Sequence, residues 1–174
     1  DAVPDDVLKL LGHSVQFYPS QTPKYQEVTV DLSTFQEGDI VQLPENGVLV
    51  DFYVAKLNYE STLNGTGRTL VVRKDVYDKR EWDSGRRNGY ASSDIDAFLN
   101  GAYKNLLGTD IQASIGTTEF YYTPGEGSST VTTLSRSVFL LSAKETGGTG
   151  SNISPEGSLL PIVDLLSPTY SDGV

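Results

Sequence analysis

Apolar residues recur at helical spacing in one stretch of the chain, residues 92–107. Ser92 and Ser93 are suitable N-cap residues, and Asp94 and Asp96 place negative charge where the dipole of a helix favours it. Gly108 follows where a helix is expected to stop. We therefore predict an amphipathic helix whose apolar face comprises Ile95, Phe98, Leu99, Ala102, Tyr103 and Leu106.

Apolar runs on both sides of this helix predict strands. These alternating or continuous runs lie at residues 27–32, 39–43, 48–57, 68–74, 117–122, 131–134 and 138–141. The runs at 48–57, 68–74 and 138–141 are apolar enough for strands buried in the centre of a sheet. Asn46-Gly47 predicts a tight hairpin between two of the strands.

The remaining stretches predict a second helix and several exposed loops. The second helix covers residues 109–115, with Thr109 as its cap, and a further short helix lies within 158–166. Glycine-rich polar loops are expected at 58–67, 84–89, 123–130 and 147–157. Strands, then helices, then strands again indicate an α+β fold with a mostly antiparallel sheet and two main helices.

The chain divides into an N-terminal segment and one domain. We interpret residues 1–27 as an arm or linker, because residues 13–25 are irregular and contain two prolines. Residues 28–174 form the domain. Irregular polar segments at both ends suit docking between protomers, so we expect a homo-oligomer.

Charge and composition exclude several classes of partner. The net charge is −10, which argues against nucleic acid and against an anionic membrane surface. No stretch is apolar enough for a membrane span. The chain has no cysteine, so disulfides and thiolate metal sites are excluded.

Candidate catalytic groups lack the context that catalysis requires. His13 is the only histidine, lies in the N-terminal arm, and has no nucleophile turn to accompany it. Acidic residues are numerous, so a glycan-cleaving enzyme that uses an acidic pair remains an alternative. The acidic run at 75–83 lacks the spacing of a calcium loop, and the run at 85–89 lacks the lysine of a phosphate loop. We therefore expect no enzymatic activity, no metal and no cofactor.

Several motifs together resemble a known family. They are Val50-Asp-Phe-Tyr-Val-Ala55, Arg68-Thr-Leu-Val-Val-Arg-Lys74, Trp82-Asp-Ser84, Asn88-x-Tyr90-x-Ser92-Ser93, Ile95-x-x-Phe98-Leu99-Asn100, Ile111-x-x-x-Ile115 and Val138-Phe-Leu-Leu-Ser142-x-x-Glu145. The pattern resembles an uncharacterised domain family of gut Firmicutes and their phages and prophages, over residues 35–148. That family implies a C-type-lectin-like fold near the formylglycine-generating-factor branch.

The chain departs from this family in ways that limit the inference. The family's tryptophan-arginine-serine-proline element is missing, so the fold is expected to be incomplete at its C-terminus. The calcium and sugar motifs of true lectins and the active-site cysteines of the formylglycine-generating branch are also missing. Calcium-dependent sugar binding and enzymatic activity therefore do not carry over.

The resemblance implies a role and a core for the domain. We expect a binding or structural module of a phage virion, in a tail, baseplate or head fibre, contacting neighbouring virion subunits and a bacterial surface glycan or protein. Its location is then the virion surface; the alternative is an extracellular or bacterial cell-surface adhesin. The expected structural core is Trp82, Phe98, Leu99, Asn100 and Leu140. Because loops carry function, the expected ligand contacts are Tyr59, Arg86, Arg87, Tyr90, Tyr121 and Tyr122.

Overall fold

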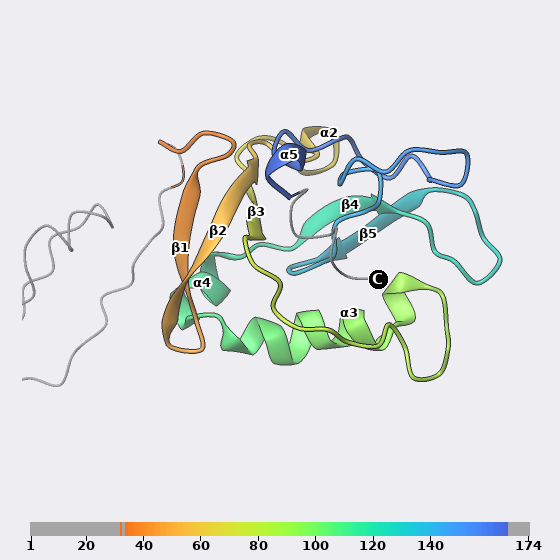
Figure 1. The fold of residues 1–174 in the computed structure, drawn as a ribbon, viewed down its shortest axis with the longest axis horizontal. Coiled ribbons are helices and arrows are strands. Elements are labelled where there is room, and N and C mark those ends of the chain that lie inside the picture. Colours follow the sequence, from red (N-terminus) through yellow and green to blue (C-terminus); the bar gives the residue numbers. More distant parts are fainter. Residues whose placement is uncertain (1–31, 33, 167–174) are drawn as a thin grey trace, which may run out of the picture. The chain divides into compact units, whose positions relative to one another are not determined.

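The computed structural model describes residue 32 and residues 34–166 (Figure 1). Leu32–Val174 forms one compact unit, distinct from Asp1–Asp31. The predicted arm at 1–27, His13 and most of the predicted strand at 27–32 lie outside the described residues.

Three antiparallel strands form sheet A, in the order β1 (Ile40–Glu45), β2 (Val48–Lys56) and β3 (Leu70–Arg73). Asn46 and Gly47 have φ of 51° and 78°, so the predicted two-residue hairpin is confirmed and Glu45 pairs with Val48. The central strand is β2. The prediction that residues 68–74 form a central strand is wrong, because among the described strands β3 pairs with β2 alone and lies at an edge.

The predicted long helix is present but irregular. It begins as α3 (Asp94–Phe98), widens to π geometry in η2 (Leu99–Tyr103) and tightens in η3 (Lys104–Leu106), and the short turn η1 (Tyr90–Ser92) precedes it. Ser93 is the N-cap, as predicted, and its Oγ accepts a hydrogen bond from the Asp96 N–H at 3.2 Å.

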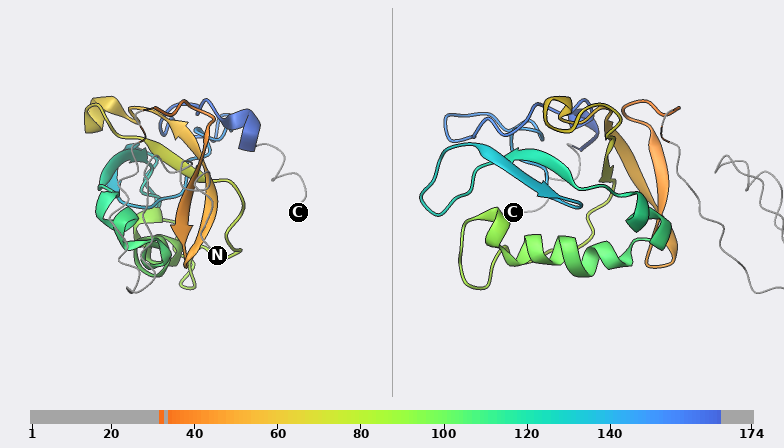
Figure 2. Two further views of the ribbon diagram at one scale, coloured as in Figure 1. Left: turned by 90° about the vertical axis from the view of Figure 1, so that its left-hand side faces the viewer. Right: turned by 180° about the vertical axis from the view of Figure 1, so that it is seen from behind.

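The second predicted helix, α4 (Thr109–Ser114), has Gly108 rather than Thr109 as its N-cap. Sheet B follows as an antiparallel hairpin of β4 (Thr118–Tyr122) and β5 (Thr132–Arg136). The helical segment 94–106 runs along both sheets, with its end beside sheet A and its start beside sheet B (Figure 2). Two further short helices, α2 (Ser61–Asn64) and α5 (Val163–Leu166), lie in connecting segments. The structure therefore confirms the α+β class with antiparallel sheets and few helices.

The prediction of a buried strand at residues 138–141 is wrong. Side chains, not a neighbouring strand, bind its backbone: Asn100 Oδ1 accepts from the Val138 N–H at 3.3 Å, and Tyr90 Oη accepts from the Leu140 N–H at 3.2 Å. These bonds leave Phe139 free to stack on Phe120 with ring centroids 4.2 Å apart.

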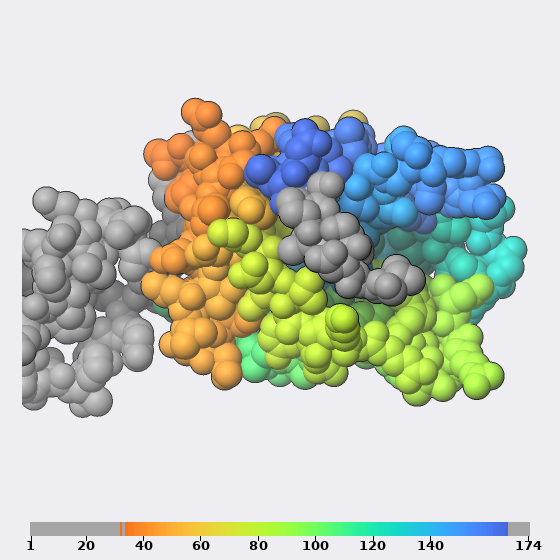
Figure 3. Space-filling view, viewed as in Figure 1, coloured from red at the N-terminus to blue at the C-terminus, as the bar shows by residue number. Residues whose placement is uncertain are grey.

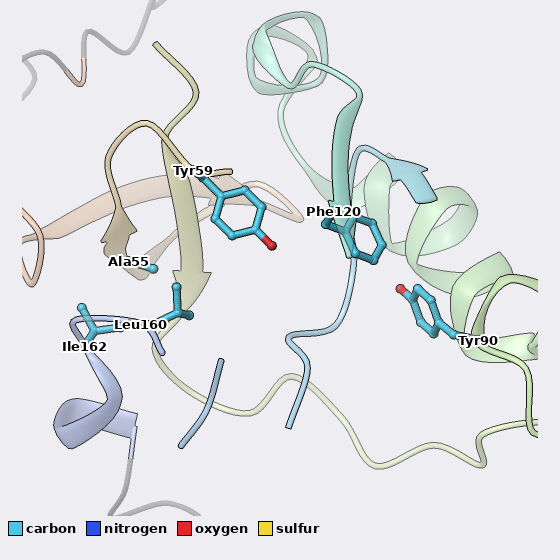
Figure 4. Packing of buried hydrophobic residues seen from close by; sticks show 6 residues of the cluster. All are labelled: Ala55, Tyr59, Tyr90, Phe120, Leu160 and Ile162. Carbon is cyan, nitrogen blue, oxygen red and sulfur yellow. The ribbon is translucent and has the colours of Figure 1, made fainter. Parts of the chain in front are cut away.

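The hydrophobic core joins residues from sheet A, sheet B, the helical region and the C-terminal segment (Figure 4). Its buried members are Ala55, Tyr59, Tyr90, Phe120, Leu160 and Ile162. Leu160 and Ile162 are each 1% exposed, so the C-terminal segment completes the core rather than lying on its surface.

The predicted core residues differ in how far they are buried. Leu99 is buried, Phe98 is half-buried, and Asn100 binds backbone groups as expected. Trp82 and Leu140 are 41% and 43% exposed, so their assignment to the core is wrong. Phe120 and Phe139 stack within the core instead, and the Trp82 ring lies against Tyr90 at a centroid distance of 5.8 Å.

Candidate functional site

Four carboxylates are buried in the described structure; three of them join separate segments of the chain, and one holds a turn. They are Glu45, Asp83, Asp96 and Glu145. Glu45 accepts hydrogen bonds from the Arg73 guanidinium and, at 2.7 Å, from the Tyr103 hydroxyl. Asp96 accepts from Nε and Nη2 of Arg136, the latter at 2.7 Å. These two groups are paired with cations and serve the fold.

Glu145 is the most isolated of the four from positive charge. Its Oε1 accepts a hydrogen bond from the Tyr59 hydroxyl at 2.7 Å, and its Oε2 accepts from the Ser142 N–H at 2.8 Å. Burial raises the pKa of Glu145, and burial together with the Glu145 charge raises the pKa of Tyr59. Tyr59 was expected to contact a ligand, but it is 2% exposed and its hydroxyl is already bound, so that expectation is corrected.

Two loops come together at one end of the domain and form what we call the loop-end surface, residues 82–90 and 122–128 (Figure 3). The Asn88 Oδ1 accepts from the Glu126 N–H at 2.6 Å, and the Ser92 hydroxyl donates to Glu126 Oε1 at 3.1 Å. A Cβ atom on Gly89 would lie 2.7 Å from the Pro124 carbonyl oxygen. The close contact of the two loops therefore depends on glycine at this position.

An ion-pair network holds the turn of the first loop. Asp83 is 3% exposed and accepts from the Arg87 N–H at 2.9 Å and from Arg87 Nη2 at 2.7 Å. Asp94 accepts from the backbone N–H and the hydroxyl of Ser84, at 2.9 and 2.6 Å. Hydrogen bonds from Arg87 lower the pKa of Asp83, and those from Ser84 lower the pKa of Asp94. Both carboxylates are therefore ionised, and both already accept hydrogen bonds within the protein.

Exposed groups suitable for recognition lie on this rigid turn. Trp82 precedes it, half-exposed, with the buried Tyr90 ring behind it. Arg86 closes the turn with φ of 60°, and no side-chain partner binds its guanidinium among the described residues. An aromatic face and a free guanidinium can stack on a ring and hydrogen-bond to polar groups of a ligand.

The loop-end surface contains only part of the predicted set. Arg86 and Arg87 lie there, but Arg87 is committed to Asp83 and Asp94. Tyr90 is 8% exposed and supports Trp82 from below, and burial raises its pKa to about 12, so its expected role as a direct contact is corrected. Tyr121 and Tyr122 are half-buried on β4. Sequence reasoning missed Trp82 as a surface residue, although its position directly before a polar turn was a usable signal.

No group of three or more histidine, cysteine, aspartate or glutamate side chains converges as a metal site within the described residues. In the acidic run at 75–83, Asp78 pairs with Arg80 at 3.1 Å and Asp83 with Arg87. Among the described residues, no helix has the length and apolar character needed to cross a membrane.

Comparison with known proteins places the chain in a family. Residues 66–169 match a family described as a domain of unknown function, DUF6273. No curated protein and no solved structure is detectably similar to the chain. The matched range includes the whole loop-end surface and begins after the β1–β2 hairpin. Because the match covers more than half of the chain, this protein is a member of the DUF6273 family.

Proposed function

We propose that the protein is a non-enzymatic binding module that recognises a bacterial surface glycan with its loop-end surface. The observation that supports this most directly is the half-exposed Trp82 ring, supported by Tyr90 and placed beside a turn that Asp83 and Arg87 hold. Large aromatic side chains gain from burial, so one left exposed on a rigid support is suited to bury its face against a ligand.

The surrounding polar groups favour a glycan as the ligand. The Arg86 guanidinium has five donors for hydroxyl, carboxylate or phosphate oxygens, and Glu126 at the adjoining loop adds an acceptor. A sugar ring offers an apolar face for Trp82 and polar edges for these groups. Side chains fixed before binding lose little conformational freedom on binding, which favours affinity.

The carboxylates argue for binding over hydrolysis. A glycosidase needs two carboxyls with divergent pKa values, one of them protonated. The pKa values of Asp83, in the loop-end surface, and of Asp94, beside it, are both lowered by hydrogen bonds from Arg87 and Ser84. Glu145 has a raised pKa but is 3% exposed, so it faces no substrate in this conformation.

The resemblance to a Firmicutes phage and prophage family supports a C-type-lectin-like fold and a place on the virion surface. In that setting, the module belongs to a tail, baseplate or head fibre, and the loop-end surface contacts the host. Loops that carry recognition on a stable scaffold are a common arrangement for such modules.

Retention on purified Firmicutes cell-wall polysaccharide tests the proposal. Trp82→Ala and Arg86→Ala should each weaken retention about tenfold, equivalent to about 1.4 kcal/mol. Leu49→Ala and Lys79→Ala are the matched controls, because both residues are exposed and lie outside the loop-end surface. Retention that survives both loop variants contradicts the proposed site, and release of reducing ends contradicts the non-enzymatic assignment.

A further inference from the structure

One edge of sheet A carries backbone groups that have no partner among the described residues. β1 is the outermost strand, and it pairs with β2 on one side only (Figure 1). The Val54 N–H donates to the Asp39 carbonyl at 2.8 Å, so Asp39 faces β2. Because alternate residues of a strand direct their N–H and C=O groups to opposite sides, Ile40, Gln42 and Pro44 face outward.

A contact at the end of the strand supports this assignment. The Gly108 N–H donates to the outward carbonyl of Pro44 at 3.0 Å, and the Asn46 N–H beside it donates to the Leu106 carbonyl. Pro44 has no N–H to leave unpaired, so that end of the edge is closed. No hydrogen bond within the described residues reaches the outward N–H and C=O groups of Ile40 and Gln42.

The side chains around this edge also lack cover. Ile40, Val48 and Leu49 on the same hairpin are 44%, 62% and 54% exposed. Proteins usually protect an exposed edge strand with a charged residue or a proline. Here only Pro44 does so, and the stretch from Ile40 to Leu43 carries no charge although the whole chain has a net charge of −10.

We propose that β1 pairs antiparallel with β1 of a second copy of this chain, about a two-fold axis at Val41. In that register, Ile40 lies opposite Gln42 of the second copy, and each such pair exchanges both of its backbone hydrogen bonds. Asp39 lies opposite Leu43 of the second copy, so within residues 39–43 no acidic residue faces another. The uncharged outer edge is thus complementary to itself, which is the reason for choosing a second copy over a different partner.

The arrangement has a consequence for recognition. The β1–β2 hairpin and the loop-end surface lie at opposite ends of the domain (Figures 1 and 2). Pairing through β1 therefore leaves both loop-end surfaces free and directed away from the two-fold axis. Two linked sites raise apparent affinity for a repetitive glycan without any new contact.

The proposal is tested by measuring the mass of the full chain in solution by analytical ultracentrifugation, over a roughly thousandfold range of concentration. We expect the wild type to approach twice its monomer mass at the upper end. Gln42→Pro removes one outward N–H and should keep the protein monomeric over the range. It leaves the β1–β2 ladder intact, because the Gln42 N–H faces away from β2. Gln42→Ala keeps that N–H and should still dimerise.

Ile40→Lys provides a second variant in case Gln42→Pro impairs folding, which circular dichroism will show. It adds a charge to the edge without removing a donor, and it should also remain monomeric. A wild type that stays monomeric throughout overturns the proposal. So does a dimer that persists in both Gln42→Pro and Ile40→Lys, since its interface then lies elsewhere. The binding function is judged separately, because the comparison of Trp82→Ala and Arg86→Ala with wild type tests the loop-end surface whether or not the protein dimerises.

Discussion

The buried bond between Tyr59 and Glu145 permits a prediction with a defined magnitude. Tyr59→Phe removes only the hydroxyl, which lies 2.7 Å from Glu145 Oε1 between residues that are 2% and 3% exposed. The ring remains and still stacks on Phe139, at a centroid distance of 5.9 Å, so no cavity forms. A lost hydrogen bond to a charged group costs about 1.5–3 kcal/mol. We expect the free energy of unfolding at pH 7 to fall by about 2 kcal/mol.

Urea denaturation measures this loss. With a slope of about 1–3 kcal/mol/M, the midpoint should fall by about 1 M with an unchanged slope. Tyr121→Phe is the matched control, because that tyrosine is half-buried and its hydroxyl has no partner among the described residues. The control should change stability by less than about 0.5 kcal/mol. A loss below that value in Tyr59→Phe refutes the reasoning.

The same pair predicts a pH dependence whose sign follows from Glu145. Burial raises the pKa of Glu145 above its ordinary 4.5, so the folded protein binds the proton more tightly than the unfolded chain. This contribution to stability is fully present below about pH 4.5 and is lost as the pH rises through the folded pKa. The Tyr59 hydroxyl favours the charged carboxylate, so Tyr59→Phe should cost more at pH 7 than at pH 4. An equal loss at both values contradicts this assignment.

Three other positions give predictions that differ in mechanism. Gly89→Ala should lower the melting temperature, because its Cβ would lie 2.7 Å from the Pro124 carbonyl oxygen. A Cβ added at Gly101 would have nothing within 4 Å, so Gly101→Ala should raise stability by about 0.5–1 kcal/mol. If thermal melts show the same effect for Gly89→Ala and Gly101→Ala, the close packing of the two loops at Gly89 is contradicted. Asp96→Ala leaves Arg136, 26% exposed, without its carboxylate, and should lower the free energy of unfolding measured in urea by about 2–3 kcal/mol. An effect near zero contradicts a stabilising role for the Asp96–Arg136 ion pair.

The β1–β2 hairpin precedes the range that matches the family, although it is part of the domain. The match begins at residue 66, after both strands, yet β2 pairs along β3 from Phe52↔Arg73 to Lys56↔Leu70. Ala55 and Val54 of β2 are fully buried. Part of the domain's core is therefore supplied by residues that precede the matched range.

Local features of the fold were predictable from the sequence because short-range chemistry determines them. Asn46-Gly47 suits the left-handed backbone of a two-residue hairpin, and Ser93 has an oxygen for the free N–H of Asp96. The pairing of β4 with β5 follows from two short runs separated by a glycine-rich loop. In the candidate site, Arg86 and Arg87 were predictable for the same reason, since they lie in a polar turn.

Burial depended on the tertiary structure. Tyr59 and Trp82 are both aromatic residues beside polar loops, and sequence alone assigned the first to the surface and the second to the core. The structure reverses both. Glu145, 86 positions away, accepts a hydrogen bond from the buried Tyr59 hydroxyl, whereas Trp82 is 41% exposed and lies against Tyr90. The local pattern of residues determined which segments form turns, strands or helices. Contacts between distant residues decided which aromatic rings fill the interior and that Trp82 remains exposed at the loop-end surface.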